Sequence, residues 1–121
     1  SNSTSLLDVD GYWGNATTRA LQRHFGTPVD GVVSSQPMAN KSIMRGCPSF
    51  EYSSKPQGST LICAMQRELG VEVDGFFGPA SANALIKRFQ SESGATVLDG
   101  RLDAPSITIK AMQRRLNAGR F

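Results

Sequence analysis

Residues 74–81 read Asp-Gly-Phe-Phe-Gly-Pro-Ala-Ser, and the pattern of this stretch recurs along the chain. An Asp side chain can bond the backbone ahead of it, and the Gly that follows accepts a positive φ angle, so Asp-Gly predicts a tight turn. Gly78 and Pro79 favour the first positions of a helix. Asp-Gly also occurs at residues 10–11, 30–31 and 99–100. We therefore expect four tight turns that each lead into a helix.

A helical template accompanies these turns. Its order is alanine, large apolar, usually glutamine, basic, polar or charged, and large apolar. It occupies residues 20–25, 64–69, 84–89 and 111–116. The two large apolar positions are four residues apart, so they stack on one helix face. Residues 10–25 align with residues 74–89 without a gap and match at seven of sixteen positions, which indicates an internal duplication.

The composition limits the size of the fold and the class of partner. A chain of 121 residues is enough for one ordinary domain or two very small ones. The net charge of +3 is mild, and the basic residues are spread over the units, which argues against a nucleic-acid binder. No apolar run approaches the roughly 20 residues that span a bilayer, so we expect no membrane insertion. The opening Ser1-Asn2 looks like a cloning remnant, so we expect the natural protein to extend upstream.

These patterns predict an all-α fold of tandem small three-helix units joined by Asp-Gly turns. Residues 1–45 form a partial unit with a first helix near 15–25. Residues 46–58, rich in Gly, Pro and Ser, are interpreted as a linker or insertion outside the core. Residues 59–121 form a complete unit with helices near 60–69, 79–91 and 105–117. We expect no sheet beyond a residue pair at the turns.

The two cysteines of the chain are candidates for a disulfide. Cys63 occupies a solvent-facing position of the helical template, where a free thiol is unusual, and Cys47 lies in the loop upstream. A bridge between them would stabilise the fold by roughly 3 kcal/mol and would need an oxidising compartment. The alternative is that both are unpaired small apolar residues. We favour the bridge.

Residues for catalysis or metal binding are scarce. His24 is the single histidine and takes a surface position of the template. One histidine and two cysteines do not supply a zinc site, and nothing places a nucleophilic serine beside His24. The Asp residues of the turns lack the further ligands of a calcium loop. We expect no catalysis by these residues, no metal and no cofactor.

The two residues that follow each Asp-Gly pair differ in their expected exposure to solvent. The second is always apolar, which predicts burial beneath the turn: these are Trp13, Val33, Phe77 and Leu102. The first varies, which predicts exposure: these are Tyr12, Val32, Phe76 and Arg101. Exposed aromatic residues beside a turn suit the apolar face of a sugar or a peptide, because they offer a large contact area at low entropic cost. Alternatively, Tyr12 and Phe76 merely cover the helix of a neighbouring unit.

The combined pattern resembles the peptidoglycan-binding domain found beside the catalytic domains of bacterial and phage cell-wall hydrolases. The match covers residues 60–117 well and rests on short motifs. These are Met65-Gln66, Asp74-Gly75-Phe76-Phe77-Gly78, Ala84-Leu85, Phe89-Gln90 and Asp99-Gly100. Residues 8–45 are similar to a partial copy that lacks the first helix. The insertion that carries Cys47, Phe50 and Tyr52 is not part of the usual unit.

The resemblance implies a secreted, extracellular, cell-wall-associated accessory module without activity of its own. It would target a hydrolase such as an N-acetylmuramidase, of the lysozyme or endolysin kind, to peptidoglycan. On this hypothesis Tyr12 and Phe76 stack on sugar or stem peptide, Arg19 and Asn83 bind carboxylates or amides, and Arg101 adds charge. The partners are peptidoglycan and an upstream catalytic domain in the same chain. The competing hypothesis is a protein-interaction module that packs on that catalytic domain.

Overall fold

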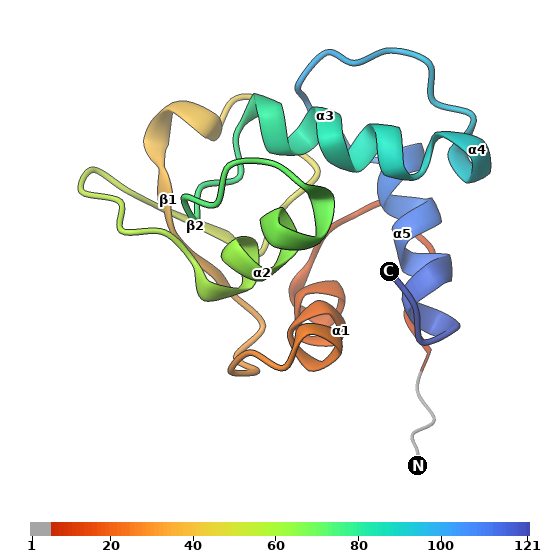
Figure 1. The fold of residues 1–121 in the computed structure, drawn as a ribbon, viewed down its shortest axis with the longest axis horizontal. Coiled ribbons are helices and arrows are strands. Elements are labelled where there is room, and N and C mark those ends of the chain that lie inside the picture. Colours follow the sequence, from red (N-terminus) through yellow and green to blue (C-terminus); the bar gives the residue numbers. More distant parts are fainter. Residues whose placement is uncertain (1–5) are drawn as a thin grey trace.

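The computed structural model describes residues 6–121, and it contains both helices and strands (Figure 1). Within these residues, five α-helices, two short strands and one 3-10 helix follow one another. In order they are α1 (Asn15–Phe25), β1 (Val33–Pro37), a 3-10 helix (Met38–Asn40), β2 (Phe50–Ser53), α2 (Thr60–Leu69), α3 (Pro79–Arg88), α4 (Gln90–Ser93) and α5 (Ile107–Asn117). The helices predicted near 15–25 and 60–69 are confirmed, whereas the all-α fold class is wrong.

The correction comes from strands β1 and β2, which pair in parallel with Val33 opposite Phe50 and Pro37 opposite Ser53. Gln36 of β1 is fully buried. Its amide donates to the carbonyl of Gly75 at 3.0 Å and accepts the N–H of Phe77 at 2.7 Å. Because a buried amide needs partners, these bonds to a distant turn hold β1 extended, so the Asp30-Gly31 turn leads into a strand and not into a helix.

The insertion also contributes to the core, contrary to the expectation that it lies outside. Phe50 is 6% exposed and packs edge-on against Trp13 and Phe77, with ring centroids 4.9 and 5.9 Å away. Trp13 and Phe77 occupy equivalent positions of the duplication and meet each other at 5.2 Å. These two residues therefore lie where the two copies meet, and Phe50 covers both. The burial predicted for Trp13, Val33, Phe77 and Leu102 is confirmed.

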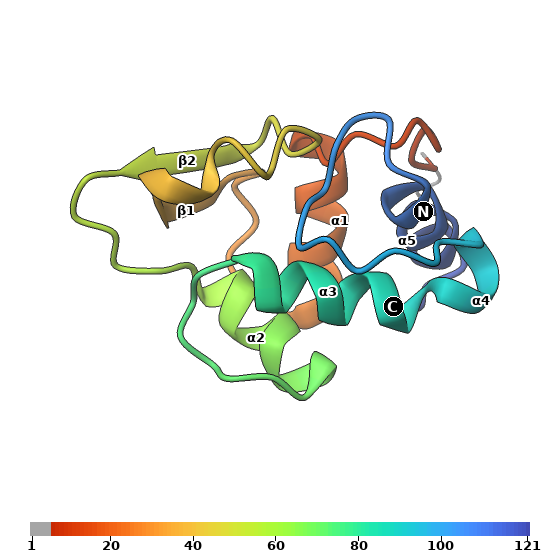
Figure 2. The same cartoon turned by 90° about the horizontal axis from the view of Figure 1, so that it is seen from above.

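The two copies share one hydrophobic core. A single cluster of buried residues draws on α1, α2, α3 and α5 as well as on both strands. In Figures 1 and 2 the strand pair lies at one end of the molecule, and α4 and α5 lie toward the other. The described parts of the two copies, residues 6–45 and 59–121, thus pack into one body.

Phe121 joins three of the helices. Its ring lies 5.1 Å from that of Phe25 and 5.6 Å from that of Phe89. Arg88 and Arg115 donate to its main-chain oxygen at 3.0 and 2.9 Å. These contacts fix Arg88, which also pairs with Glu68 at 3.2 Å.

The expected disulfide is absent, since Cys47 and Cys63 are both free. Cys47 is 3% exposed and belongs to the core beneath β2. Cys63 lies instead over the turn at Gly75, where an added Cβ would be 3.3 Å from its sulfur. The thiols thus pack in separate places. Burial raises the pKa of the Cys47 thiol, and burial, with a smaller contribution from Cys47, raises the pKa of Tyr52 to about 12.

Candidate binding grooves

A buried glutamine holds each of three Asp-Gly turns. Gln66 of α2 accepts the N–H groups of Asp74 and Gly75 at 3.0 and 2.9 Å. Its amide donates to the carbonyl of Phe76 at 2.9 Å, to Asp74 Oδ1 at 2.9 Å and to Ser81 Oγ at 3.1 Å. One side chain therefore fixes the turn, the aromatic residue after it and the first turn of α3.

The same arrangement recurs where the two ends of the chain meet. Gln113 of α5 accepts the N–H groups of Asp10 and Gly11 at 3.0 and 3.1 Å. It donates to the carbonyl of Tyr12, to Asp10 Oδ1 and to Thr17 Oγ1, each at 3.0 Å. Helix α5 is thus placed against α1 as α2 is placed against α3. The first helix that the N-terminal copy lacks in sequence is supplied by the C-terminal helix.

The third Asp-Gly turn repeats this glutamine contact, and the fourth uses a variant of it. Gln22 accepts the N–H groups of Asp30 and Gly31 at 3.0 and 2.9 Å. At the last turn the template glutamine is replaced by Ile86, and Asn83 Oδ1 instead accepts the N–H of Gly100 at 2.7 Å. The amide oxygen of Asn83 is therefore committed to the fold.

Two of the turn carboxylates are held in their charged form. The N–H of Tyr12 and then the amide of Gln113 lower the pKa of Asp10. The amide of Gln22 and then the N–H of Val32 lower the pKa of Asp30, and the charge of Arg19 adds a smaller effect. A hydrogen bond to the ionised carboxylate favours that form over the protonated one.

Two hollows lie beside α1, and two more lie at equivalent positions beside α3. We call the first pair the α1 groove and the second pair the α3 groove. The α1 groove comprises a hollow of about 390 Å³ at the turn and one of about 350 Å³ along the helix, which share Leu7 in their linings. The first is lined by Leu7, Asp8, Asp10, Tyr12, Gly14, Asn15, Ala16, Thr17, Arg19 and Gln113. The second is lined by Leu6, Leu7, Ala20, Arg23, His24, Leu116, Asn117 and Gly119.

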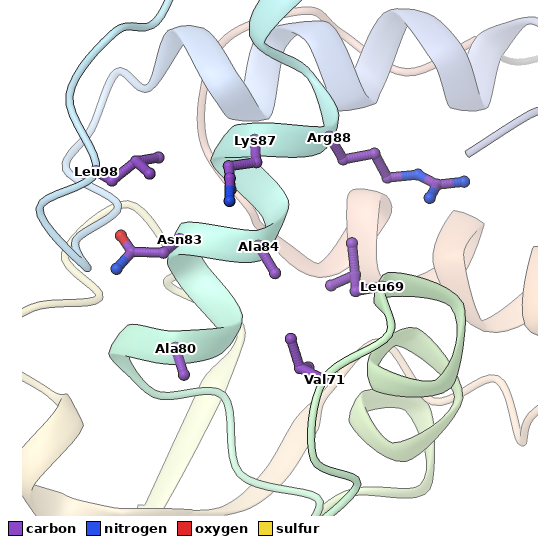
Figure 3. Close-up of a pocket in the computed structure, with 8 residues that line it drawn as sticks. All are labelled: Leu69, Val71, Ala80, Asn83, Ala84, Lys87, Arg88 and Leu98. Atoms are coloured by element: carbon purple, nitrogen blue, oxygen red, sulfur yellow. The ribbon is translucent and has the colours of Figure 1, made fainter.

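The α3 groove likewise comprises a turn hollow of about 210 Å³ and a helix hollow of about 600 Å³, which share Val71 and Ala80 in their linings. Figure 3 shows the helix hollow. The first is lined by Gln66, Val71, Glu72, Asp74, Phe76, Gly78, Pro79, Ala80 and Ser81. The second is lined by Leu69, Val71, Ala80, Asn83, Ala84, Lys87, Arg88 and Leu98. Figure 3 shows most of these side chains coming from α3, with Leu69 and Val71 facing them from the end of α2 and the segment after it.

The two grooves correspond residue by residue. In the turn hollows Leu7, Asp8, Asp10 and Tyr12 match Val71, Glu72, Asp74 and Phe76, and Gly14 to Thr17 match Gly78 to Ser81. In the helix hollows Ala20, Arg23 and His24 match Ala84, Lys87 and Arg88. The duplication has therefore preserved a surface as well as a core.

Four of the five predicted site residues line these grooves. Tyr12, 46% exposed, and Arg19 lie together in the α1 groove. Phe76, half-buried, and Asn83 line the two hollows of the α3 groove. Arg101 lines neither groove and lies 3.5 Å from Asp103.

Sequence reasoning did not assign a role to the glutamines. Their signal was present, because Gln22 and Gln66 each precede an Asp-Gly turn by eight residues. The Gln113 contact spans 103 residues in the reverse order, so spacing alone does not reveal it.

No protein-family model, no curated protein and no solved structure matches this chain. Within residues 6–121, no group of three or more His, Cys, Asp or Glu side chains is placed to hold a metal ion. Over the same residues, no helix has the length and apolar character needed to cross a bilayer.

Proposed function

We propose that this chain is a non-catalytic module that binds peptidoglycan and holds a secreted cell-wall hydrolase on its substrate. The observation that carries the proposal is the recurrence of one groove at two places, with an aromatic residue beside the turn in each. Peptidoglycan is a repeating polymer, and a duplicated binding surface suits a repeating ligand. The resemblance of the turn-and-helix cassette to the peptidoglycan-binding domain points to the same ligand.

The chemistry of the grooves is compatible with sugar and stem peptide. The exposed ring of Tyr12 offers a flat apolar face, and Arg19, whose guanidinium lies against Gly31, also lines this hollow and can donate to a carboxylate or amide. Phe76 offers a smaller exposed area at the equivalent place. Binding at a single groove of this size is expected to be weak, and two grooves on one body would raise the retention on a polymer.

The test is sedimentation of the protein with purified peptidoglycan sacculi. Tyr12→Ala is expected to weaken retention by about fivefold, since a stacked aromatic contributes about 1 kcal/mol. Tyr12→Phe should bind nearly as well, because the ring is kept. Val29→Ala is the matched control, since Val29 is 48% exposed and lines neither groove.

Two results would contradict the proposal. One is no retention of the unmodified protein on sacculi from several wall types. The other is retention that Tyr12→Ala and Phe76→Ala leave unchanged. Association of the free module with the upstream catalytic domain, without retention on the wall, would instead favour the protein-interaction hypothesis.

A further inference from the structure

Four charged residues in the grooves have no structural role in the fold. Asp8 and Glu72 lie at equivalent positions of the turn hollows, and Arg23 and Lys87 lie at equivalent positions of the helix hollows. All four are exposed. Within residues 6–121 none of them takes part in an ion pair or a side-chain hydrogen bond.

The two copies differ in residue type at these positions but agree in the sign of the charge. Asp8 corresponds to Glu72, and Arg23 corresponds to Lys87. At another position of the same helices the charge is not kept, because Arg19 corresponds to Asn83, whose amide oxygen accepts the N–H of Gly100. Packing does not require a charge at an exposed position, so the kept signs point to a ligand.

The charges give each groove the same polarity. At the turn end, Asp8 lies beside Asp10 in one groove, and Glu72 lies beside Asp74 in the other. At the helix end each groove presents a cation. The other cation of the α3 groove, Arg88, is held by Glu68 and Phe121, which leaves Lys87 available. In the α1 groove Arg19 also lines the turn hollow, and its guanidinium lies against Gly31.

We propose that each groove binds a short peptide that carries an ammonium group and a carboxylate, namely the stem peptide of peptidoglycan. The ammonium group lies by Asp8 or Glu72, and the carboxylate lies by Arg23 or Lys87. The inference rests on the proposed function and narrows it from the polymer to its peptide. A glycan strand whose lactyl carboxyls are amidated carries no charge and cannot pair with an acidic and a basic end, whereas a stem peptide complements both.

The test measures affinity for soluble fragments by NMR titration. The probes are a synthetic stem tetrapeptide with a free lysine side chain and a free C-terminus, its lysine-acetylated form, its C-terminal amide, and the peptide-free disaccharide with its lactyl carboxyl capped as the methylamide so that it carries no charge. The N-terminus is acetylated in every peptide, so that only two groups differ. We expect the free tetrapeptide to bind best, each capped form to bind about two- to fivefold more weakly, and the disaccharide to bind least.

Charge-neutralising variants assign each end. Asp8→Asn combined with Glu72→Gln should weaken the free peptide by a similar factor and leave the lysine-acetylated peptide unaffected. Arg23→Gln combined with Lys87→Gln should also weaken binding of the free peptide and should leave the affinity for the C-terminal amide unaffected. Glu51→Gln and Lys55→Gln are the matched controls, because both residues are exposed and line neither groove. Exposed substitutions of this kind change stability by only about 0.5 kcal/mol or less.

The outcomes separate this inference from the proposed function. Retention on sacculi together with equal affinity for all peptides, or with stronger binding of the disaccharide, overturns the inference and leaves wall binding intact. Failure to sediment with sacculi overturns both. Loss of discrimination between free and capped peptides in the paired variants, with the controls unchanged, supports the inference.

Discussion

At the scale of single residues, Gln66 determines the shape of its turn through five hydrogen bonds. We predict that Gln66→Leu destabilises the protein by about 3 kcal/mol, because the buried N–H of Gly75 and its neighbours lose their partners while the volume is kept. Urea denaturation monitored by circular dichroism measures the change.

Arg67, the next residue, is the control for that substitution. It is exposed, and Arg67→Ala should stay within about 0.5 kcal/mol of the parent protein. A Gln66→Leu variant as stable as Arg67→Ala would mean that the turn holds without its glutamine. Gln22→Leu, at the equivalent contact, should repeat the large effect.

Asp30 gives the protein a pH dependence of predictable sign. Hydrogen bonds from Gln22 and Val32 hold its pKa below the usual value of 3.8 in the folded state. A carboxyl with a lowered folded pKa contributes stability that is present above its unfolded pKa and is lost as the pH falls through the folded value. We predict that stability falls as the pH drops below about 4, and that Asp30→Asn reduces this slope.

Thermal unfolding at a series of pH values checks the prediction. Asn keeps an oxygen that accepts the same N–H groups but does not titrate in this range, so the variant isolates the charge. Asp10→Asn should behave alike, since the N–H of Tyr12 and the amide of Gln113 lower the pKa of Asp10. Equal slopes for the parent and both variants would contradict the argument.

At the scale of elements, β2 depends on one side chain of the insertion. Phe50 packs against the rings of both Trp13 and Phe77, which also contact each other. We predict that Phe50→Ala destabilises the protein by about 3–5 kcal/mol, because it leaves a cavity at the junction of the two copies. Glu51→Ala on the same strand, where the side chain is exposed, should have little effect by the same denaturation measurement.

The sequence predicts the helices better than the strands, for a physical reason. The helices carry their own signals: apolar residues four apart, a Ser or Gly before the first turn, and Gly26 or Gly70 after the last. Strand β1 has no such pattern, because the partners that keep Gln36 buried are at Gly75 and Phe77. The disulfide failed as a prediction because sequence adjacency does not tell which way Cys47 points.

At the scale of the whole molecule, the chain closes on itself through α5. The duplication and the missing first helix of the N-terminal copy were evident in the sequence. The replacement of that helix by α5 was not, because Gln113 reaches Asp10 across 103 residues and Asn117 binds Leu7 across 110. The α1 groove is therefore composite, with Tyr12 and Arg19 from one end of the chain and Gln113 and Leu116 from the other.

Two equivalent grooves on one body make a quantitative prediction about avidity. If both bind the wall at once, the second contact forms at the high effective concentration set by the first. Tyr12→Ala should then reduce retention on sacculi by the full factor of about five that the α1 groove loses, while it lowers affinity for a soluble tetrapeptide only at that groove. Phe76→Ala should show the same contrast at the α3 groove, and the double variant should lose retention. If each single variant reduces retention by about twofold or less, the grooves act one at a time, because the unmodified groove still holds the protein on the wall.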